Sequence, residues 1–144
     1  MRSILTLLCL VIAARRLDAQ AGDLLSRRVR LTVEWKATPE EQQSVESAFV
    51  SAGWPLVTGR GPEDRATLAL FLNRRQTTAD TSVHNTAWTA RVIDMESGKF
   101  LRSLSCISRG SVELPSGLAV RLRRELADSS VIPQTQARNV SCSD

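Results

Sequence analysis

Residues 28–54 have the sequence RVRLTVEWKATPEEQQSVESAFVSAGW and carry the strongest secondary-structure signals in the chain. The first nine of these residues alternate apolar and polar side chains, which predicts a β-strand with one buried face. A helix is predicted next, because Thr38 can cap it, Pro39 suits its first turn and Glu41 completes a capping box. Gly53 then predicts a left-handed helix end, with Trp54 in hydrophobic contact just beyond it.

The following segment is predicted to contain two strands and a long loop. Residues 55–58 predict a short strand, and residues 66–72, which are apolar on both faces, predict a central strand. Residues 73–85 are polar and rich in Thr, Ser and Asp. We therefore expect a mobile loop there.

The rest of the domain is predicted as a hairpin and a second helix. Strands are expected over 87–94 and 99–105, joined by a turn in which Gly98 supplies a positive φ. From Ser116 to about Ala127, leucines recur every four residues, which indicates a helix with one apolar stripe. This order of elements predicts an α+β fold, a two-layer sandwich with a mostly antiparallel sheet of four to five strands and two helices on one face. The domain would span 22–127.

The amino terminus has the parts of a secretory signal peptide. A basic start is followed by an apolar run from Ile4 to Ala14 and by small residues at 19–21. The run is too short to span a bilayer, which needs roughly 20 residues. Residues 1–21 are therefore predicted as a leader, with cleavage after Ala21 or after Ala14. The mature chain is expected to be periplasmic or extracellular, with no transmembrane segment.

Charge and cysteine content are consistent with a small exported domain. The leader holds three Arg and one Asp, so its removal lowers the net charge from +4 to +2. This small excess argues against a nucleic-acid partner. Cys106 and Cys142 remain in the mature chain and predict one disulfide, which would pin the extended tail over 128–144. A redox-active pair would normally have much closer spacing.

A family resemblance involves residues 88–101, WTARVIDMESGKFL. Here a strand ends at Asp94, turns through Ser97 and Gly98, and returns with an apolar pair. With the preceding strand, helix and strand, this order resembles the α/β domain of the curli secretion channel, of the penicillin-binding-protein activator lipoproteins and of the amino-terminal part of the Tol–Pal beta-propeller protein. The resemblance covers about residues 28–127, although no lipobox is found. It implies a partner-binding envelope module and transfers no catalytic residue.

No motif in the sequence points to catalysis, a cofactor or a metal. His84 is the only histidine and is expected to be a solvated loop residue. Four arginines flank the predicted central strand and form a candidate patch for an acidic partner: Arg60, Arg65, Arg74 and Arg75. The sequence thus predicts a non-catalytic binding or accessory module of the bacterial cell envelope whose partner is another envelope protein. A small secreted enzyme of unknown class and a purely structural accessory domain are the alternatives.

Overall fold

The computed structural model describes residues 23–80, 83–111, 113–128, 138–140 and 142 of the chain. The predicted leader, residues 1–21, lies outside the described residues. The elements are β1 (Val29–Val33), α2 (Pro39–Ser51), a 3-10 helix η1 (Pro62–Asp64), β2 (Leu68–Asp80), β3 (Val83–Asp94), β4 (Phe100–Arg109), α3 (Ser116–Ala127) and β5 (Arg138–Asn139).

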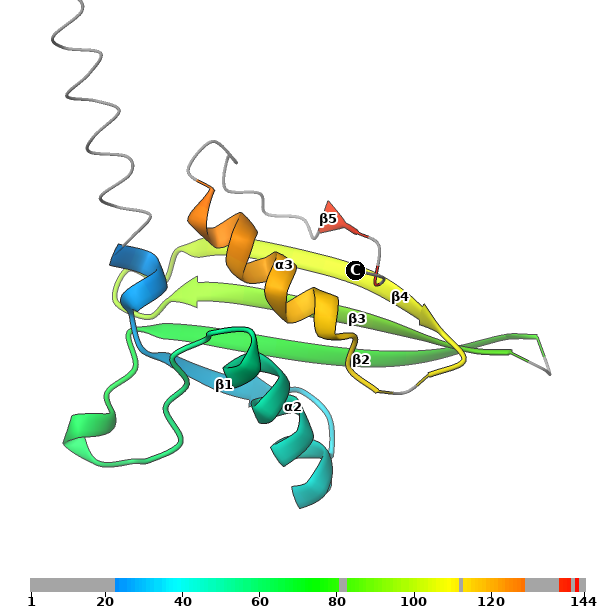
Figure 1. The fold of residues 1–144 in the computed structure, drawn as a ribbon, viewed down its shortest axis with the longest axis horizontal. Coiled ribbons are helices and arrows are strands. Elements are labelled where there is room, and N and C mark those ends of the chain that lie inside the picture. The colour runs from blue at the N-terminus through cyan, green and yellow to red at the C-terminus, as the bar shows by residue number, and fades with distance from the viewer. Residues whose placement is uncertain (1–22, 81–82, 112, 129–137, 141, 143–144) are drawn as a thin grey trace, which may run out of the picture.

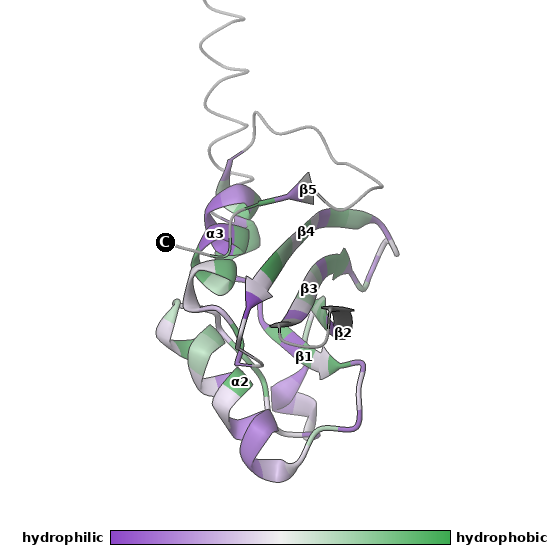
Figure 2. Cartoon of the chain, turned by 90° about the vertical axis from the view of Figure 1, so that its right-hand side faces the viewer, coloured by the Kyte–Doolittle hydropathy of each residue, from purple (hydrophilic) through white to green (hydrophobic). Residues whose placement is uncertain are grey.

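The strands form one sheet in the order β1-β2-β3-β4-β5. The β2–β3 and β3–β4 pairs are antiparallel, whereas β1 pairs with β2 and β5 pairs with β4 in parallel. Helices α2 and α3 lie on the same side of this sheet, which is here called the covered face (Figures 1 and 2). The predicted α+β sandwich, with two helices on one face, is therefore confirmed.

The core lies between the covered face and the two helices. Leu68, Leu70 and Leu72 of β2 are completely buried, and their neighbours Ala69 and Phe71 on the other side of the strand are only partly buried. Because β2 lies between β1 and β3, this burial confirms it as the central strand that the apolar run predicts.

Both ends of α2 follow the local sequence signals. Thr38 Oγ1 accepts a hydrogen bond from the Glu41 N–H at 3.2 Å, and the Glu41 carboxylate accepts one from the Thr38 N–H at 3.0 Å. Gly53 has a φ of +85°, as the left-handed helix end requires. Trp54 is buried beside Phe49, and its Nε1–H donates to the Ala119 carbonyl at 2.9 Å. This last bond ties the end of α2 to α3.

The prediction of a mobile loop over residues 73–85 is wrong. Residues 73–80 continue β2, residues 83–85 begin β3, and the two strands form a long hairpin that extends beyond the helices (Figure 1). Because most of this part of the hairpin extends beyond the helices (Figure 1), its strands need no continuous apolar face and the usual alternation is missing. The segment also lacks Gly and Pro and is rich in Thr, which favours strands.

A second strand is predicted over residues 55–58, but the structure has only an isolated β-bridge there. Leu56 bridges Val29 in parallel, through the bonds Val29 N–H to Pro55 O and Val57 N–H to Val29 O. Pro55 has no N–H to donate, which limits how far this pairing can extend. The helix predicted from Ser116 to Ala127 and the positive φ predicted at Gly98 are both confirmed.

The described part of the tail is held against β4. Arg138 and Asn139 pair with Leu104 and Ser105 as the short strand β5. Cys142 forms a disulfide with Cys106 of β4, with 5.3 Å between the two Cα atoms. The disulfide that the cysteine count predicts is therefore present, and it ties Cys142, a described residue of the tail, to β4.

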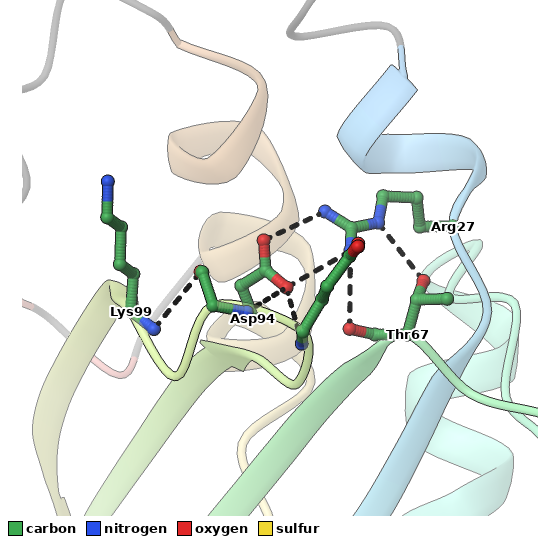
Figure 3. Close-up of polar contacts among 6 residues, drawn as sticks. Arg27, Thr67, Asp94 and Lys99 are labelled. Carbon is green, nitrogen blue, oxygen red and sulfur yellow. Dashed lines mark hydrogen bonds and ion pairs between the residues drawn. The ribbon is translucent and has the colours of Figure 1, made fainter.

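A polar cluster closes the end of the sheet at which β2 begins. Arg27 donates from Nε to Thr67 Oγ1 at 3.0 Å and forms an ion pair with Asp94 at 3.2 Å (Figure 3). The Asp94 carboxylate also accepts from the Glu96 N–H at 2.9 Å. The Arg27 guanidinium, followed by this backbone bond, lowers the pKa of Asp94 from 3.8 to about 2. The cluster joins the segment before β1 to the turn between β3 and β4.

Candidate functional site

The four arginines that the sequence singles out do not form one patch. Arg60 and Arg65 are exposed in the segment between α2 and β2, on either side of η1. Arg74 and Arg75 lie six and seven residues after Leu68, the first residue of β2. At the usual rise of a strand, this places Arg74 about 20 Å from the start of β2. Since neighbouring strand residues face opposite sides, Arg74 and Arg75 also lie on different faces of the sheet.

Arg74 lies on the covered face and its guanidinium is already occupied. Its Nη1 forms an ion pair with Glu41 Oε1 at 3.0 Å, and its Cζ lies 4.9 Å from the centre of the Trp35 ring. Trp35 in turn packs edge-on against Trp88, with 5.7 Å between ring centres. The Thr38 N–H, followed by Arg74, lowers the pKa of Glu41. This arrangement holds α2 on the sheet and leaves no free charge for a partner.

The other side of the sheet, here called the open face, points away from α2 and α3 (Figure 2). Strand register assigns sixteen described side chains to it: Arg30, Thr32, Ala69, Phe71, Asn73, Arg75, Asn85, Ala87, Thr89, Arg91, Ile93, Phe100, Ser103, Ser105, Ile107 and Arg109. Four of them are arginines and none is acidic. Glu34, which follows β1, is the acidic residue that reaches this face, through an ion pair with Arg91 at 2.5 Å.

Three of the four open-face arginines have no partner among the described residues. Arg30, Arg75 and Arg109 are exposed, and no hydrogen bond or ion pair to a described residue engages their guanidinium groups. Strand spacing places the Cα atoms of Arg75 and Arg109 about 12 Å apart, and those of Arg30 and Arg75 about 20 Å apart. The open face therefore carries separated, available positive charges along its length.

Apolar and hydroxyl side chains fill the space between these charges. Phe71 lies at the centre of the face, with the Arg91 guanidinium 6.0 Å from its ring centre. Thr89 and Ser105 share a hydrogen bond at 3.2 Å between their hydroxyl oxygens. Ile107 is 63% exposed, which is the largest exposed fraction among the large hydrophobic residues described. Such a surface, which combines apolar and hydroxyl side chains with separated positive charges, suits contact with an acidic macromolecule better than it suits enclosure of a small molecule.

Only some of the residues on the open face can be predicted from the sequence. Alternation over 28–36 places Arg30 on the polar side of its strand, so this residue can be found from the sequence. Arg75 and Arg109 join it only through the register of β2, β3 and β4, which no local pattern encodes. His84 belongs to β3, paired with Thr78, and not to a loop.

Two further observations concern the described residues only. No group of three or more His, Cys, Asp or Glu side chains is placed to hold a metal ion within the described ranges. Of the helices in this part of the chain, none has the length and apolar character needed to cross a membrane.

Comparison with known proteins gives only distant structural similarities. No protein-family model matches the chain, and no curated protein matches it significantly. The solved PelC dodecamer from Paraburkholderia phytofirmans is similar with a TM-score of 0.39 and 19% identity, over 72% of this chain and 87% of that one. Lipoprotein GNA1162 from Neisseria meningitidis gives 0.42 and 16%, over 69% and 94%. A minor lipoprotein from Acinetobacter baumannii gives 0.39 and 13%, over 76% and 96%.

Proposed function

We propose that this chain is an exported, non-catalytic binding module of the bacterial cell envelope, and that its open face contacts an acidic envelope protein. The observation that carries the proposal is a set of three arginines that have no hydrogen-bond or ion-pair partner among the described residues, on a face that α2 and α3 leave uncovered. Unpaired positive charges on one surface attract and orient an acidic partner. An exported location is supported by the leader-like amino terminus and by the disulfide, which is typical of oxidising compartments.

The distribution of charge separates a binding role from a structural one. An arginine that serves stability has a carboxylate or carbonyl partner, as Arg27 and Arg74 do. Arg30 and Arg75 have none in the described part of the chain, and each needs only water to be satisfied. Such residues contribute little to folding, so a partner is the function that best accounts for their alignment on one face.

The test reverses the charge of the open face in cells. The variant Arg30→Glu/Arg75→Glu is expressed with its leader, and envelope proteins are crosslinked to it and identified by mass spectrometry. The matched control, Lys99→Glu/Arg124→Glu, changes the same amount of charge at exposed positions away from the open face. We expect one acidic envelope protein to be recovered with the native chain and with the control, and to be lost with the open-face variant.

Further arms of the experiment address the sequence-based prediction and the alternatives. Arg60→Glu/Arg65→Glu tests whether the exposed segment before β2 contributes to the same contact. Equal recovery of the partner with the open-face variant would contradict the proposal. Recovery of an anionic glycan in place of a protein would also contradict it, since the proposed partner is a protein.

A further inference from the structure

Among the described residues, β5 covers only part of the outer edge of β4. It pairs with Leu104 and Ser105, and the Val140 N–H then donates to the Ser105 carbonyl at 2.8 Å. Cys142 is bonded to Cys106, whose buried side chain lies on the covered face, and the two Cα atoms are 5.3 Å apart. Cys142 therefore lies beside Cys106 and not beside Ser108, where a continued β5 would place it. The rest of β4 continues past the end of β5 to Arg109.

The part of the edge that no described residue covers has backbone groups in position for another strand. In a strand, the N–H and C=O groups of alternate residues point to the same side. Since the Ser105 carbonyl points outward to Val140, the backbone groups of Ile107 and Arg109 point outward too. Neither residue has an outward backbone hydrogen bond to any described residue. An edge of this kind is a template for strand addition.

A groove runs beside this edge. It has a volume of about 690 Å³ and lies between β4, the segment that leads into α3 and the disulfide-bonded end of the tail. Its lining includes Ile107 and Arg109 from β4, Glu113 and Leu114 from the segment before α3, and Val140 and Cys142 from the tail. The volume lies in the range of sites that accept a drug-sized ligand or a few residues of peptide.

We propose that the edge from Ile107 to Arg109 binds an extended segment of the partner as an additional strand that lies in line with β5. The inference rests on the proposed function, because the segment would belong to the acidic partner. β5 shows that this edge already accepts an extended chain, and the new strand would continue that pairing. The side chains of Ile107 and Arg109 both lie on the open face.

The chemistry of these two side chains defines the segment. Neighbouring side chains on adjacent strands contact each other, so an apolar residue fits beside the exposed Ile107 and an acidic residue fits beside Arg109. Residues that share a face of a strand are two positions apart. The expected segment is therefore extended, with an apolar and an acidic residue separated by one position, and its acidic end reaches the charges of the open face.

The first experiment uses a synthetic peptide of that pattern. The probe is the N-acetylated and C-amidated peptide Thr-Glu-Thr-Val-Thr-Glu-Thr, which presents Glu on both sides of Val and so fits either strand direction. The control peptide has Lys in place of both Glu. Amide NMR spectra of the oxidised mature chain are followed during titration. We expect the Glu peptide to shift the amide resonances of Ile107 and Arg109, and to slow their hydrogen exchange, while the Lys peptide does not.

Two variants separate the backbone contact from the charge contact. Ile107→Pro removes one outward N–H from an edge position where proline is tolerated. Arg109→Glu should reverse the preference, so that the Lys peptide binds and the Glu peptide does not. Each variant is expected to weaken binding of the Glu peptide by about tenfold or more, equal to about 1.4 kcal/mol. Arg124→Glu on α3 is the matched control and should leave the affinity unchanged.

The outcomes distinguish this inference from the proposed function. Resonance shifts confined to β1, or no shift at millimolar peptide, would overturn the strand-addition site. If the open-face variant nevertheless loses its partner in cells, the proposed function stands without this site. If the peptide binds at β4 while the open-face variant keeps its partner, the strand-addition site is supported and the proposed role of Arg30 and Arg75 in partner binding is contradicted.

Discussion

On the covered face of the sheet, Arg74 and Arg102 both have bonded partners, whereas on the open face Arg30, Arg75 and Arg109 have none among the described residues. Arginine therefore has a different role on each side of the sheet: on the covered face it binds groups of the domain itself, and on the open face its charge stays available. A buried guanidinium must be satisfied by the protein itself, because an unpaired buried charge is strongly destabilising. An exposed guanidinium is satisfied by water and stays available.

Arg102 shows how strict this requirement is on the covered face. Only 8% of the residue is exposed, and its guanidinium donates to the carbonyls of Leu101, Glu125 and Asp128 at 2.7 to 2.9 Å. Two of these carbonyls belong to the carboxyl-terminal end of α3, where unpaired acceptors and the negative end of the helix dipole favour a cation. Arg102 thus fastens α3 to β4, and its charge is compensated inside the domain.

The largest effect on the covered face should come from the disulfide at Cys106. The variant Cys106→Ser/Cys142→Ser opens a loop of 36 residues and should lower the free energy of unfolding by about 3–4 kcal/mol. Urea unfolding monitored by tryptophan fluorescence measures this change. Reduction of the native protein should reproduce it, and thiols that react with alkylating reagents before reduction would show that the bond is absent.

A somewhat smaller loss is expected from Arg102→Leu. The substitution removes the hydrogen bonds that Arg102 donates to three carbonyls, two of them at the end of α3, so we expect a loss of about 2–3 kcal/mol. The measurement is again the free energy of unfolding in urea. Arg124→Leu is a matched control, since it removes an exposed arginine of the same helix. An equal effect of the two substitutions would show that the contacts of Arg102 are unimportant for stability.

The sequence predicts the elements whose signals are local. Both ends of α2 follow from Thr38 and Gly53, and the turn between β3 and β4 follows from Gly98. The β2–β3 hairpin is missed because its polar strands extend past the helices and have no apolar face to give them a period. Once residues 73–80 are known to form a strand, alternation alone separates Arg74 from Arg75. The role of Arg102 has no sequence signal, because its partners on α3 lie 23 and 26 residues away.

A third prediction concerns the polar cluster at the start of β2, where Arg27 is held by Asp94. The pKa of Asp94 is lowered to about 2, so the ionised carboxylate is favoured in the folded chain. This contribution to stability is fully present above the ordinary value of 3.8 and is lost as the pH falls through that value toward about 2. The difference in unfolding free energy between the native chain and Asp94→Asn should therefore shrink over this pH range. A difference that stays constant from pH 5 to pH 2 would contradict the assignment to charge.

The smallest effects on stability are expected from substitutions of the adjacent residues Arg74 and Arg75. Because these two residues lie on opposite faces, comparing them tests the difference between the faces most directly. Arg74→Gln removes an ion pair with Glu41 and the contact with Trp35, and should cost about 1 kcal/mol. Arg75→Gln removes no hydrogen bond, ion pair or ring contact with a described residue, and its effect on the free energy of unfolding should stay within about 0.5 kcal/mol. For recovery of the envelope partner, we expect the opposite result: Arg75→Gln should reduce recovery more than Arg74→Gln does. The reason is that only Arg75 carries a charge that a partner can reach. If Arg75→Gln destabilised the domain as much as Arg74→Gln, the open face would need an intramolecular partner. Its arginines would then be structural like those on the covered face.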